Sequence, residues 1–385
     1  MNHVNYITHI QEFTKKWSTE RCFTNSLTSP ELNEHINLSS LLPFNSDIYH
    51  QRKAIFINLF IFIKKGKMEL TFNSIVFEHN TGLHPENAMR LSAFRHLRQN
   101  ELIDGERYLS LVHSTDHIQK IRDNSKDFYQ IDDDTFLSNQ SYAVACYSVG
   151  AAVQAAETGN FALIRPPGHH SYRDKASGFC LFNNVAIASE HKVREGKRVL
   201  IIDFDGHYGD GTADIFYETD KVLYFSIHQH PAFPGTGDLH LIGDGKGKGF
   251  NMNMGVPPNS GDDIFLDAFS HFLPIFKSFN PDVVAISAGF DGAEEDPLLQ
   301  LNLSPNAFYQ IGKMIASSFT NTFAVLEGGY HPGALERGIY SFLAGMNGQN
   351  IPYTAEKSIS GLRAWETYEM NLHSVLGFLK PFWKI

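Results

Sequence analysis

The sequence predicts an α/β protein built on a mainly parallel sheet. From Met68 onward, short apolar runs alternate with stretches that have apolar residues at three- and four-residue spacing. This alternation of strand and helix patterns is typical of parallel sheets covered by helices. Several apolar runs lead directly into polar loops, as expected where a sheet carries a site at the carboxyl ends of its strands. The 385 residues, 42% hydrophobic, supply enough apolar material for one large domain or two ordinary ones.

The predicted elements follow from these patterns in chain order. The apolar runs predict strands at Ser74–Phe77, Phe161–Ile164, Val199–Phe204, Val222–Ile227, Asp282–Ser287 and Phe323–Glu327. The helical spacing predicts helices at Tyr142–Glu157, Asn184–Arg194, Asp262–Phe279 and Pro305–Phe319.

Residues 1–67 differ in character from the rest of the chain. They are polar and rich in Asn and Ser, and they close with the run "AIFINLFIFI" followed by "KKGK". That run has about half of the ~20 residues that a membrane span requires, so a buried strand or helix is favoured. Because Met68 could itself be a start, residues 1–67 are treated as an extension without an assigned role.

Composition excludes several classes of function. The formal net charge of −10 argues against direct nucleic-acid binding, which depends on clustered Lys and Arg, but it tolerates a basic partner. The three cysteines, Cys22, Cys146 and Cys180, are widely spaced and indicate neither a disulfide framework nor a thiolate zinc site. We therefore expect a reducing, cytoplasmic location and no membrane association; secretion as an effector and assembly into a homo-oligomer stay open.

Polar loops follow five of the predicted strands. They read "RPPGHH", "DGHYGDG", "HQHPAFPGTGD", "AGFDGAEEDP" and "GGYHP". Because the carboxyl ends of parallel strands meet at one edge of a sheet, these residues are expected to converge although they lie far apart in sequence.

Three of these residues form a candidate metal-ligand set. Asp205 and His207 stand two residues apart after a strand, so that in extended chain their side chains point the same way. Asp291 follows another strand and would supply a third ligand, leaving a position for water and substrate as in catalytic zinc sites. Two carboxylates and one imidazole suit Zn²⁺, Fe²⁺ and Mn²⁺, so the ligand types alone do not decide which of these ions the site would hold.

Two adjacent imidazoles, His169 and His170, offer a general base for a metal-assisted hydrolase. Asp203 and Asp210 remain once Asp205 is assigned to the metal, and each could orient one histidine. The hydroxyl of Tyr330, after two glycines, could donate to an oxyanion.

Loop aromatics predict the shape of the pocket. Phe179 and Phe233 would form a narrow apolar slot that fits the methylene stem of a lysine-like side chain. The acidic run Asp132–Asp134 is either solvated charge at a helix entry or a grip on the backbone N–H groups of a substrate.

These residues together resemble the histone deacetylase and acetylpolyamine amidohydrolase superfamily, which has an arginase-like α/β fold. The motifs "RPPGHH", "GFCLFNNVAIA", "IDFDGHYGDGT", "FPGTGD", "SAGFDGAEEDPL" and "LEGGY" occur in that family's order between about Met68 and Gly348. "RPPGHH" and "SAGFD" are more similar to the class II and bacterial branch than to class I. The resemblance implies a single catalytic domain over residues 68–385.

The resemblance also implies roles for individual residues. One zinc ion per subunit would be bound by Asp205, His207 and Asp291; His170 would be the general base and acid, His169 an electrostatic helper, Asp203 and Asp210 their partners, and Tyr330 the transition-state tyrosine. The implied substrate-binding residues are Asp134, Gly178, Phe179, Phe233 and Leu298. Structural potassium is implied at two sites, the first formed by Asp203, Asp205, His207, Ser226 and Ile227, and the second by Phe216, Thr219, Val222 and Phe250.

Three positions differ from the family's usual pattern. Tyr208 replaces a second histidine, Asp210 stands where class II relatives often carry Asn, and Leu298 stands where one acetylpolyamine-specific branch has a glutamate. The last difference favours an acetyl-lysine protein or peptide as substrate, with an acetylated small amine as the alternative.

Two other readings are less well supported. A two-manganese ureohydrolase lacks its extra ligands, because Gly209 and Ala293 stand at the required positions. A silent binding module would be expected to have lost the tyrosine or a histidine.

Overall fold

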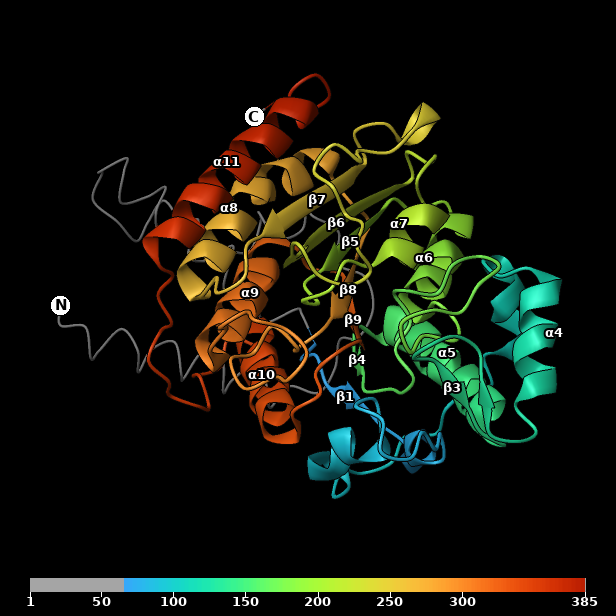
Figure 1. Cartoon of the computed structure of the whole chain (residues 1–385). Helices are drawn as coiled ribbons and strands as arrows, with labels where there is room; N and C mark the ends of the chain where they lie inside the picture. Colours follow the sequence, from blue (N-terminus) through green and yellow to red (C-terminus); the bar gives the residue numbers. More distant parts are fainter. Residues whose placement is uncertain (1–65, 385) are drawn as a thin grey trace, which may run out of the picture. The chain divides into compact units, whose positions relative to one another are not determined.

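The computed structural model describes residues 66–384. A parallel sheet with the strand order β1-β4-β9-β8-β5-β6-β7 runs through the middle of this part of the chain (Figure 1). Its strands are β1 (Leu70–Thr71), β4 (Phe161–Ala162), β5 (Val199–Asp203), β6 (Val222–Gln229), β7 (Asn251–Val256), β8 (Val283–Ala288) and β9 (Thr322–Leu326). The predicted α/β fold class with a parallel sheet is therefore confirmed.

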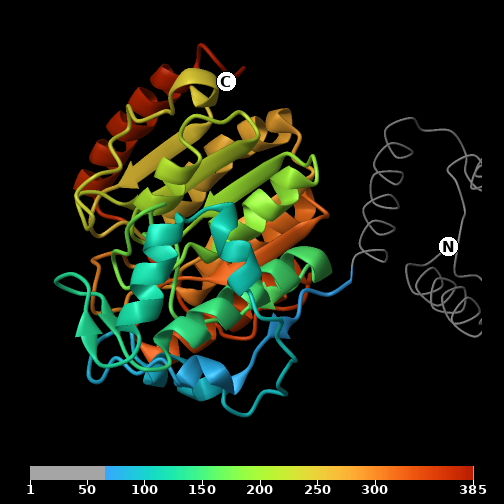
Figure 2. The ribbon, with the colours of Figure 1, turned by 90° about the vertical axis from the view of Figure 1, so that its right-hand side faces the viewer.

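Helices cover both faces of the sheet. On one face, α5 (Ser141–Thr158) packs against β4 and β9, and α6 (Asn184–Arg194) packs against β5 and β8. On the other, α8 (Asp262–Phe279) and α11 (Leu362–Leu379) pack against β6 and β7. Figure 2 views the domain from the side of α5 and α6 and shows them in front of the strands.

The other helical segments flank these layers. Helices α9 and α10 extend the layer of α8 and α11, and α7 packs against α6. A short antiparallel pair, β2 with β3, stands apart from the main sheet. The bounds are α4 (Thr115–Asn124), α7 (Asp210–Ile215), α9 (Pro305–Ser318), α10 (Pro332–Met346), β2 (Tyr129–Gln130), β3 (Phe136–Leu137), and the 3-10 helices η2 (Ser74–Phe77), η3 (Ala88–Phe94), η4 (Glu106–Leu111) and η5 (Gly245–Gly247).

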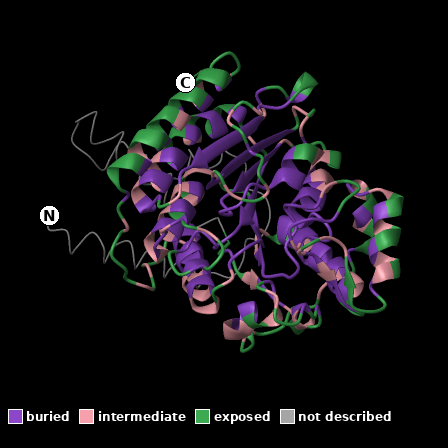
Figure 3. Cartoon of the chain, viewed as in Figure 1, coloured by how far each residue is buried: buried purple, intermediate pink, exposed green. Residues whose placement is uncertain are grey.

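Burial of the sheet explains why most of its strands are continuous apolar runs. Every residue of β4 to β9 is buried, and Figure 3 shows this buried centre between the helices. Beneath the carboxyl ends of the strands, the ring of Phe204 packs against those of Phe290, Phe308 and Phe342. This aromatic cluster is the apolar layer beneath the polar loops.

The helix boundaries follow local capping. Asn183 accepts the N–H of Ala186 and begins α6, while Ser304 accepts the N–H of Asn306 and begins α9 with Pro305 in the first turn. Gly159 ends α5 in the left-handed conformation, with φ of 75°. The predicted bounds of α6 and α8 coincide with the structure; those of α5 differ by one residue at each end, and those of α9 by one residue at its C-terminal end.

One predicted strand was wrong. Ser74–Phe77 forms the 3-10 helix η2, in which only Val76 is buried. The Asn73 side chain accepts the N–H of Ile75 at 3.0 Å, which turns the chain away from the sheet. Leu70–Thr71 takes the place beside Phe161–Ala162 instead.

The described residues contain no helix long and apolar enough to cross a membrane. The predicted extension, residues 1–67, falls almost wholly outside the described residues, as does the apolar run Ala54–Ile63. The division of the chain at Met68 stays a prediction.

Candidate active site

The loops that follow β5, β8 and β9 meet at the carboxyl edge of the sheet. The backbone N–H of Gly206 donates to Asp291 Oδ1 at 2.7 Å, and the N–H of Gly328 donates to Asp205 Oδ2 at 2.8 Å. These bonds join residues that are 85 and 123 positions apart in the chain. The expected convergence of the strand ends is thus present in the fold.

Asp205, His207 and Asp291 form a compact buried group. Each offers a ligand atom, and these atoms all lie within 4.8 Å of one another. Nδ1 of His207 lies 2.8 Å from Asp291 Oδ2 and 3.3 Å from Asp205 Oδ1. Burial alone would lower the pKa of His207, but the carboxylates of Asp291 and Asp205 outweigh it and raise the pKa to about 10.

The donor chemistry of this group fits a divalent cation. Asp205 and Asp291 are fully buried, and in the described part of the chain neither forms an ion pair with Lys or Arg. Buried carboxylates need a compensating positive charge, and imidazole nitrogens and carboxylate oxygens are both ligand types that zinc takes. A backbone N–H holds one oxygen of each carboxylate, and the other oxygen faces the His207 ring.

The two adjacent histidines each bond to their own carboxylate. His169 Nδ1 lies 3.2 Å from Asp203 Oδ2, and His170 Nδ1 lies 2.7 Å from Asp210 Oδ1. Their ring centroids are 4.0 Å apart, and the His170 ring is 6.2 Å from that of His207. Since Nδ1 of His170 is engaged by Asp210, its Nε2 remains available for proton transfer.

The two imidazoles have different environments. Burial would lower the pKa of His169, but Asp205 and Asp203 raise it well above the usual range. Burial together with the positive charge of His169 lowers the pKa of His170 to about 4, against the opposing effect of Asp210. A charged His169 beside a neutral His170 is the distribution that a helper and a base require.

Tyr330 stands at the edge of the same group, held by an arginine that the sequence analysis did not single out. The Arg90 guanidinium lies 4.6 Å from the centroid of the Tyr330 ring. Its Nε donates to the carbonyl of Gly329 at 2.7 Å, and its Nη2 donates to the carbonyl of Glu327 at 2.6 Å. Arg90 comes from η3, so no local pattern connects it to this loop.

The predicted slot residues both lie at the site. The Phe233 ring lies 5.0 Å from that of His170 and 6.3 Å from that of His207, whereas the Phe179 ring lies 5.6 Å from that of Tyr330. Gly178 has φ of 53°, and a Cβ there would meet His170 at 2.5 Å. Only glycine therefore allows this loop to approach the base. His84, a residue not foreseen, packs edge-on against Phe179 at 4.5 Å.

The rim residues lie farther out. Asp134 is half-buried in the loop between β2 and β3; its neighbour Thr135 accepts the N–H of Phe179 at 3.1 Å. Burial and the adjacent Asp132 raise the pKa of Asp134 to about 6. Leu298 is 36% exposed on the loop that carries Asp291. Both roles stay predictions.

The residues of the predicted potassium sites are neighbours in the fold. Asp203 pairs with Ser226 across β5 and β6, close to the metal-ligand group. For the second site, the carbonyl of Phe250 accepts the N–H of Tyr224, and the turn from Phe216 to Thr219 precedes β6. Potassium binding stays a prediction at both.

Two further carboxyl and hydroxyl groups complete the site, and the sequence analysis gave neither a role. Glu327 Oε2 accepts the N–H groups of Gly168 at 2.7 Å and His169 at 3.1 Å, which fixes the loop of the histidine pair. The Tyr172 hydroxyl donates to Asp210 Oδ2 at 2.7 Å. Glu327 lies inside the motif "LEGGY" at the end of a predicted strand, and Tyr172 stands two residues after "RPPGHH"; those positions were the available signal.

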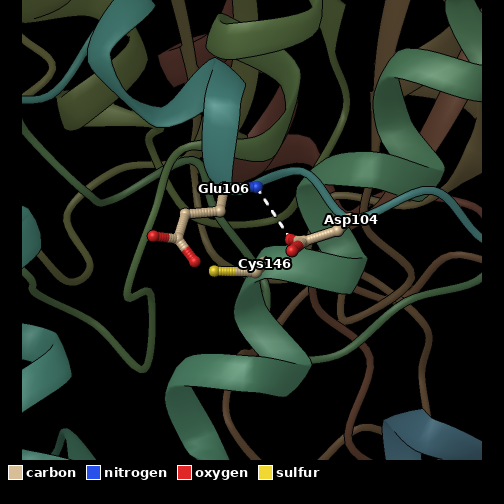
Figure 4. A group of neighbouring side chains, drawn as sticks. All are labelled: Asp104, Glu106 and Cys146. Atoms are coloured by element: carbon tan, nitrogen blue, oxygen red, sulfur yellow. Dashed lines mark hydrogen bonds between the residues drawn. The ribbon is translucent and has the colours of Figure 1, made fainter.

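A second group of neighbouring side chains, Asp104, Glu106 and Cys146, is shown in Figure 4. Its chemistry argues against a metal site. Arg122 already pairs with Glu106, and burial raises the pKa of the Cys146 thiol to about 12, so the thiolate is disfavoured. Among the described residues, no Lys or Arg pairs with Asp205 or Asp291, whose only ion-pair partners are histidines.

Fold and site together define a class: an α/β protein with a candidate metal centre and paired histidines at the carboxyl edge of a parallel sheet. Residues 84–346 match the model of the histone deacetylase domain. The chain belongs to the histone deacetylase family.

Individual relatives agree with this assignment. A probable deacetylase of Methanothermobacter thermautotrophicus is 39% identical over 72% of this chain and 90% of its own length. The histone deacetylase HDA1 of Saccharomyces cerevisiae is 35% identical over 60% of this chain and 36% of its own. A solved structure, the HDA15 HD domain, is similar with a TM-score of 0.74 and 29% identity, covering 83% of this chain and 97% of that one.

Proposed function

We propose that this protein is a zinc-dependent deacetylase that hydrolyses the acetyl amide of N-acetyl-lysine in proteins or peptides to acetate and free lysine. The observation that carries the proposal is the pair His169 and His170, each bonded to its own carboxylate beside the buried Asp205, His207 and Asp291. Zinc bound by these three residues would polarise the amide carbonyl and acidify a water molecule.

The chain's own residues then move the protons. Nε2 of His170 accepts a proton from the water as its oxygen adds to the carbonyl carbon, while Asp210 holds the ring in place. The Tyr330 hydroxyl donates to the developing oxyanion. When the C–N bond breaks, His170 returns the proton to the departing lysine nitrogen, so acetic acid and a neutral amine form; the acid then loses its proton and leaves as acetate.

The proposed substrate follows from the slot and the rim. Phe179 and Phe233 would enclose the methylene stem of the lysine, and Asp134 would accept N–H groups of the substrate backbone. Leu298 carries no charge that would bind a second ammonium group, which favours an acyl-lysine chain over a polyamine.

Kinetics on matched substrates test the proposal. The zinc-loaded protein is assayed with acetyl-lysine peptides, acetylpolyamines and longer acyl-lysine peptides, with and without chelator. We expect chelator-sensitive acetate release with the highest kcat/KM on acetyl-lysine. A tenfold preference for acetylpolyamines would refute the substrate, and no release from any of them would refute the activity.

A substitution tests the catalytic assignment separately. Tyr330→Phe removes one oxyanion donor and is expected to lower kcat by about 100-fold with zinc content unchanged. Tyr309→Phe on α9, which removes a hydroxyl that donates to the carbonyl of Gln349, is the matched control and should leave kcat unaltered. Wild-type turnover in Tyr330→Phe would contradict the role of the tyrosine.

A further inference from the structure

A single carboxylate joins the loop that carries Asp291 to the loop that carries Tyr330. Asp296 Oδ2 accepts the backbone N–H of Tyr330 at 2.6 Å and that of His331 at 3.3 Å. Its other oxygen, Oδ1, accepts the N–H of Leu298 at 3.1 Å within its own loop. The residue is 6% exposed.

We propose that Asp296 is a positioning residue for the deacetylation reaction, which fixes the Tyr330 hydroxyl relative to the metal-ligand group. The proposal rests on the proposed function, because it assigns the tyrosine a part in that reaction. Within the described part of the chain, Asp296 forms no hydrogen bond with the slot residues or the histidine pair, so its effect would pass through the backbone of Tyr330.

The arrangement restrains the tyrosine from two sides. Arg90 binds the carbonyl groups of Glu327 and Gly329, which precede Tyr330, while Asp296 binds the N–H groups of Tyr330 and His331. Gly329, which precedes Tyr330, has φ of 118°, a backbone conformation that residues other than glycine rarely adopt. Glycine alone does not fix this conformation, so the turn depends on the hydrogen bonds from Arg90 and to Asp296. A displacement of about 1 Å at a reacting group is sufficient to lower turnover by about 100-fold.

The carboxylate is required because both of its oxygens accept from N–H groups. Asparagine at this position has one acceptor oxygen and one donor nitrogen, so its amide nitrogen would face either the N–H of Tyr330 or the N–H of Leu298. Either orientation places two donors against each other in a buried site. Asp296→Asn therefore removes one of the bonds between the two loops with almost no change in side-chain volume.

The decisive experiment is a double-mutant cycle on the zinc-loaded full chain, with kcat expressed per bound zinc. Asp296→Asn is expected to lower kcat about 10- to 100-fold with KM changed less than threefold. In the Tyr330→Phe background the same substitution should change kcat less than twofold, because the hydroxyl it positions is already gone. An equal loss in both backgrounds, or wild-type kcat in Asp296→Asn, would overturn the proposal.

Asp262→Asn is the matched control. Asp262 is also buried and accepts the N–H of Ser304 at 2.8 Å, but it links α8 to the start of α9 rather than the two catalytic loops. We expect this variant to keep kcat within twofold even if its melting temperature falls. Should Asp296→Asn fail to fold, Asp296→Glu replaces it in the cycle; it keeps the charge but displaces the oxygens by one methylene, and the same outcomes apply.

Hydrogen exchange separates this proposal from the proposed function. In the wild-type chain the amides of Tyr330 and His331 should exchange slowly, and in Asp296→Asn at least tenfold faster, whether or not the protein deacetylates anything. Unaltered exchange at both amides would refute the claim that Asp296 restrains the backbone of Tyr330 and His331. Faster exchange in a protein without deacetylase activity would refute only the assigned reaction and the positioning role within it.

Discussion

Gly328 is expected to tolerate no side chain, because it lies between the carboxylates of Asp205 and Asp291. A Cβ at this position would stand 2.6 Å from Asp205 Oδ2 and closer still to Asp291 Oδ2. Ordinary contact begins at 3.4 Å, so in Gly328→Ala the Asp205 carboxylate must move away by roughly 0.8 Å and that of Asp291 by more. A shift of that size at the metal-ligand group should lower kcat/KM by about 100-fold and weaken zinc binding by 10- to 100-fold.

Zinc affinity by chelator competition, and kcat/KM on an acetyl-lysine peptide, measure this effect. Gly377→Ala is the matched control, since a Cβ at Gly377 in α11 has no neighbour within 4 Å. It should keep both quantities and gain up to about 1 kcal/mol in stability from better helix propensity. If Gly328→Ala retained wild-type zinc affinity and turnover, the assignment of the two carboxylates as ligands would be refuted.

Two further predictions concern stability. Glu86→Gln should cost about 3 to 5 kcal/mol in the free energy of unfolding, because Glu86 is the buried partner of both Arg90 and Arg165. His79 tests the pH dependence of stability. Burial, together with Arg165 and His84, lowers the pKa of His79 to about 4, although Glu86 opposes the shift. Between this pKa and the usual histidine value of about 6.5, the imidazole is therefore neutral in the folded protein and protonated in the unfolded chain. Stability should therefore fall as pH drops from about 6.5 towards 4, and between pH 7 and 5 His79→Gln should lose about 2 kcal/mol less than wild type.

Urea unfolding measures both effects. For the buried network, Glu106→Gln is the control, because its ion pair with Arg122 is half-exposed and should contribute less than about 1 kcal/mol. A loss below 1 kcal/mol in Glu86→Gln would count against the network. For the titration, an equal loss of unfolding free energy between pH 7 and 5 in the wild type and in His79→Gln would show that protonation of His79 does not cause this loss.

The local pattern predicted well wherever burial is continuous. Strands β5, β6, β8 and β9 are apolar runs because helices cover both faces of the sheet, so their positions could be inferred from these runs alone. Strand β7 escaped prediction, because "NMNMGV" is not a continuous apolar run. The side-chain amide of its buried Asn253 donates to the carbonyl of Leu241 at 2.6 Å, a contact that no periodicity reveals.

The sequence by itself determined which residues gather at the carboxyl edge of the sheet, because parallel strands bring their ends together whatever the loops contain. Asp205, His207, His169, His170, Asp291 and Tyr330 were all named from their places after strands. Only the tertiary structure decided what holds them: Arg90, Glu327 and Asp296 act across large gaps in the chain. The physical reason is that a buried polar group must find a partner wherever packing supplies one, and that partner leaves no mark in the neighbouring sequence.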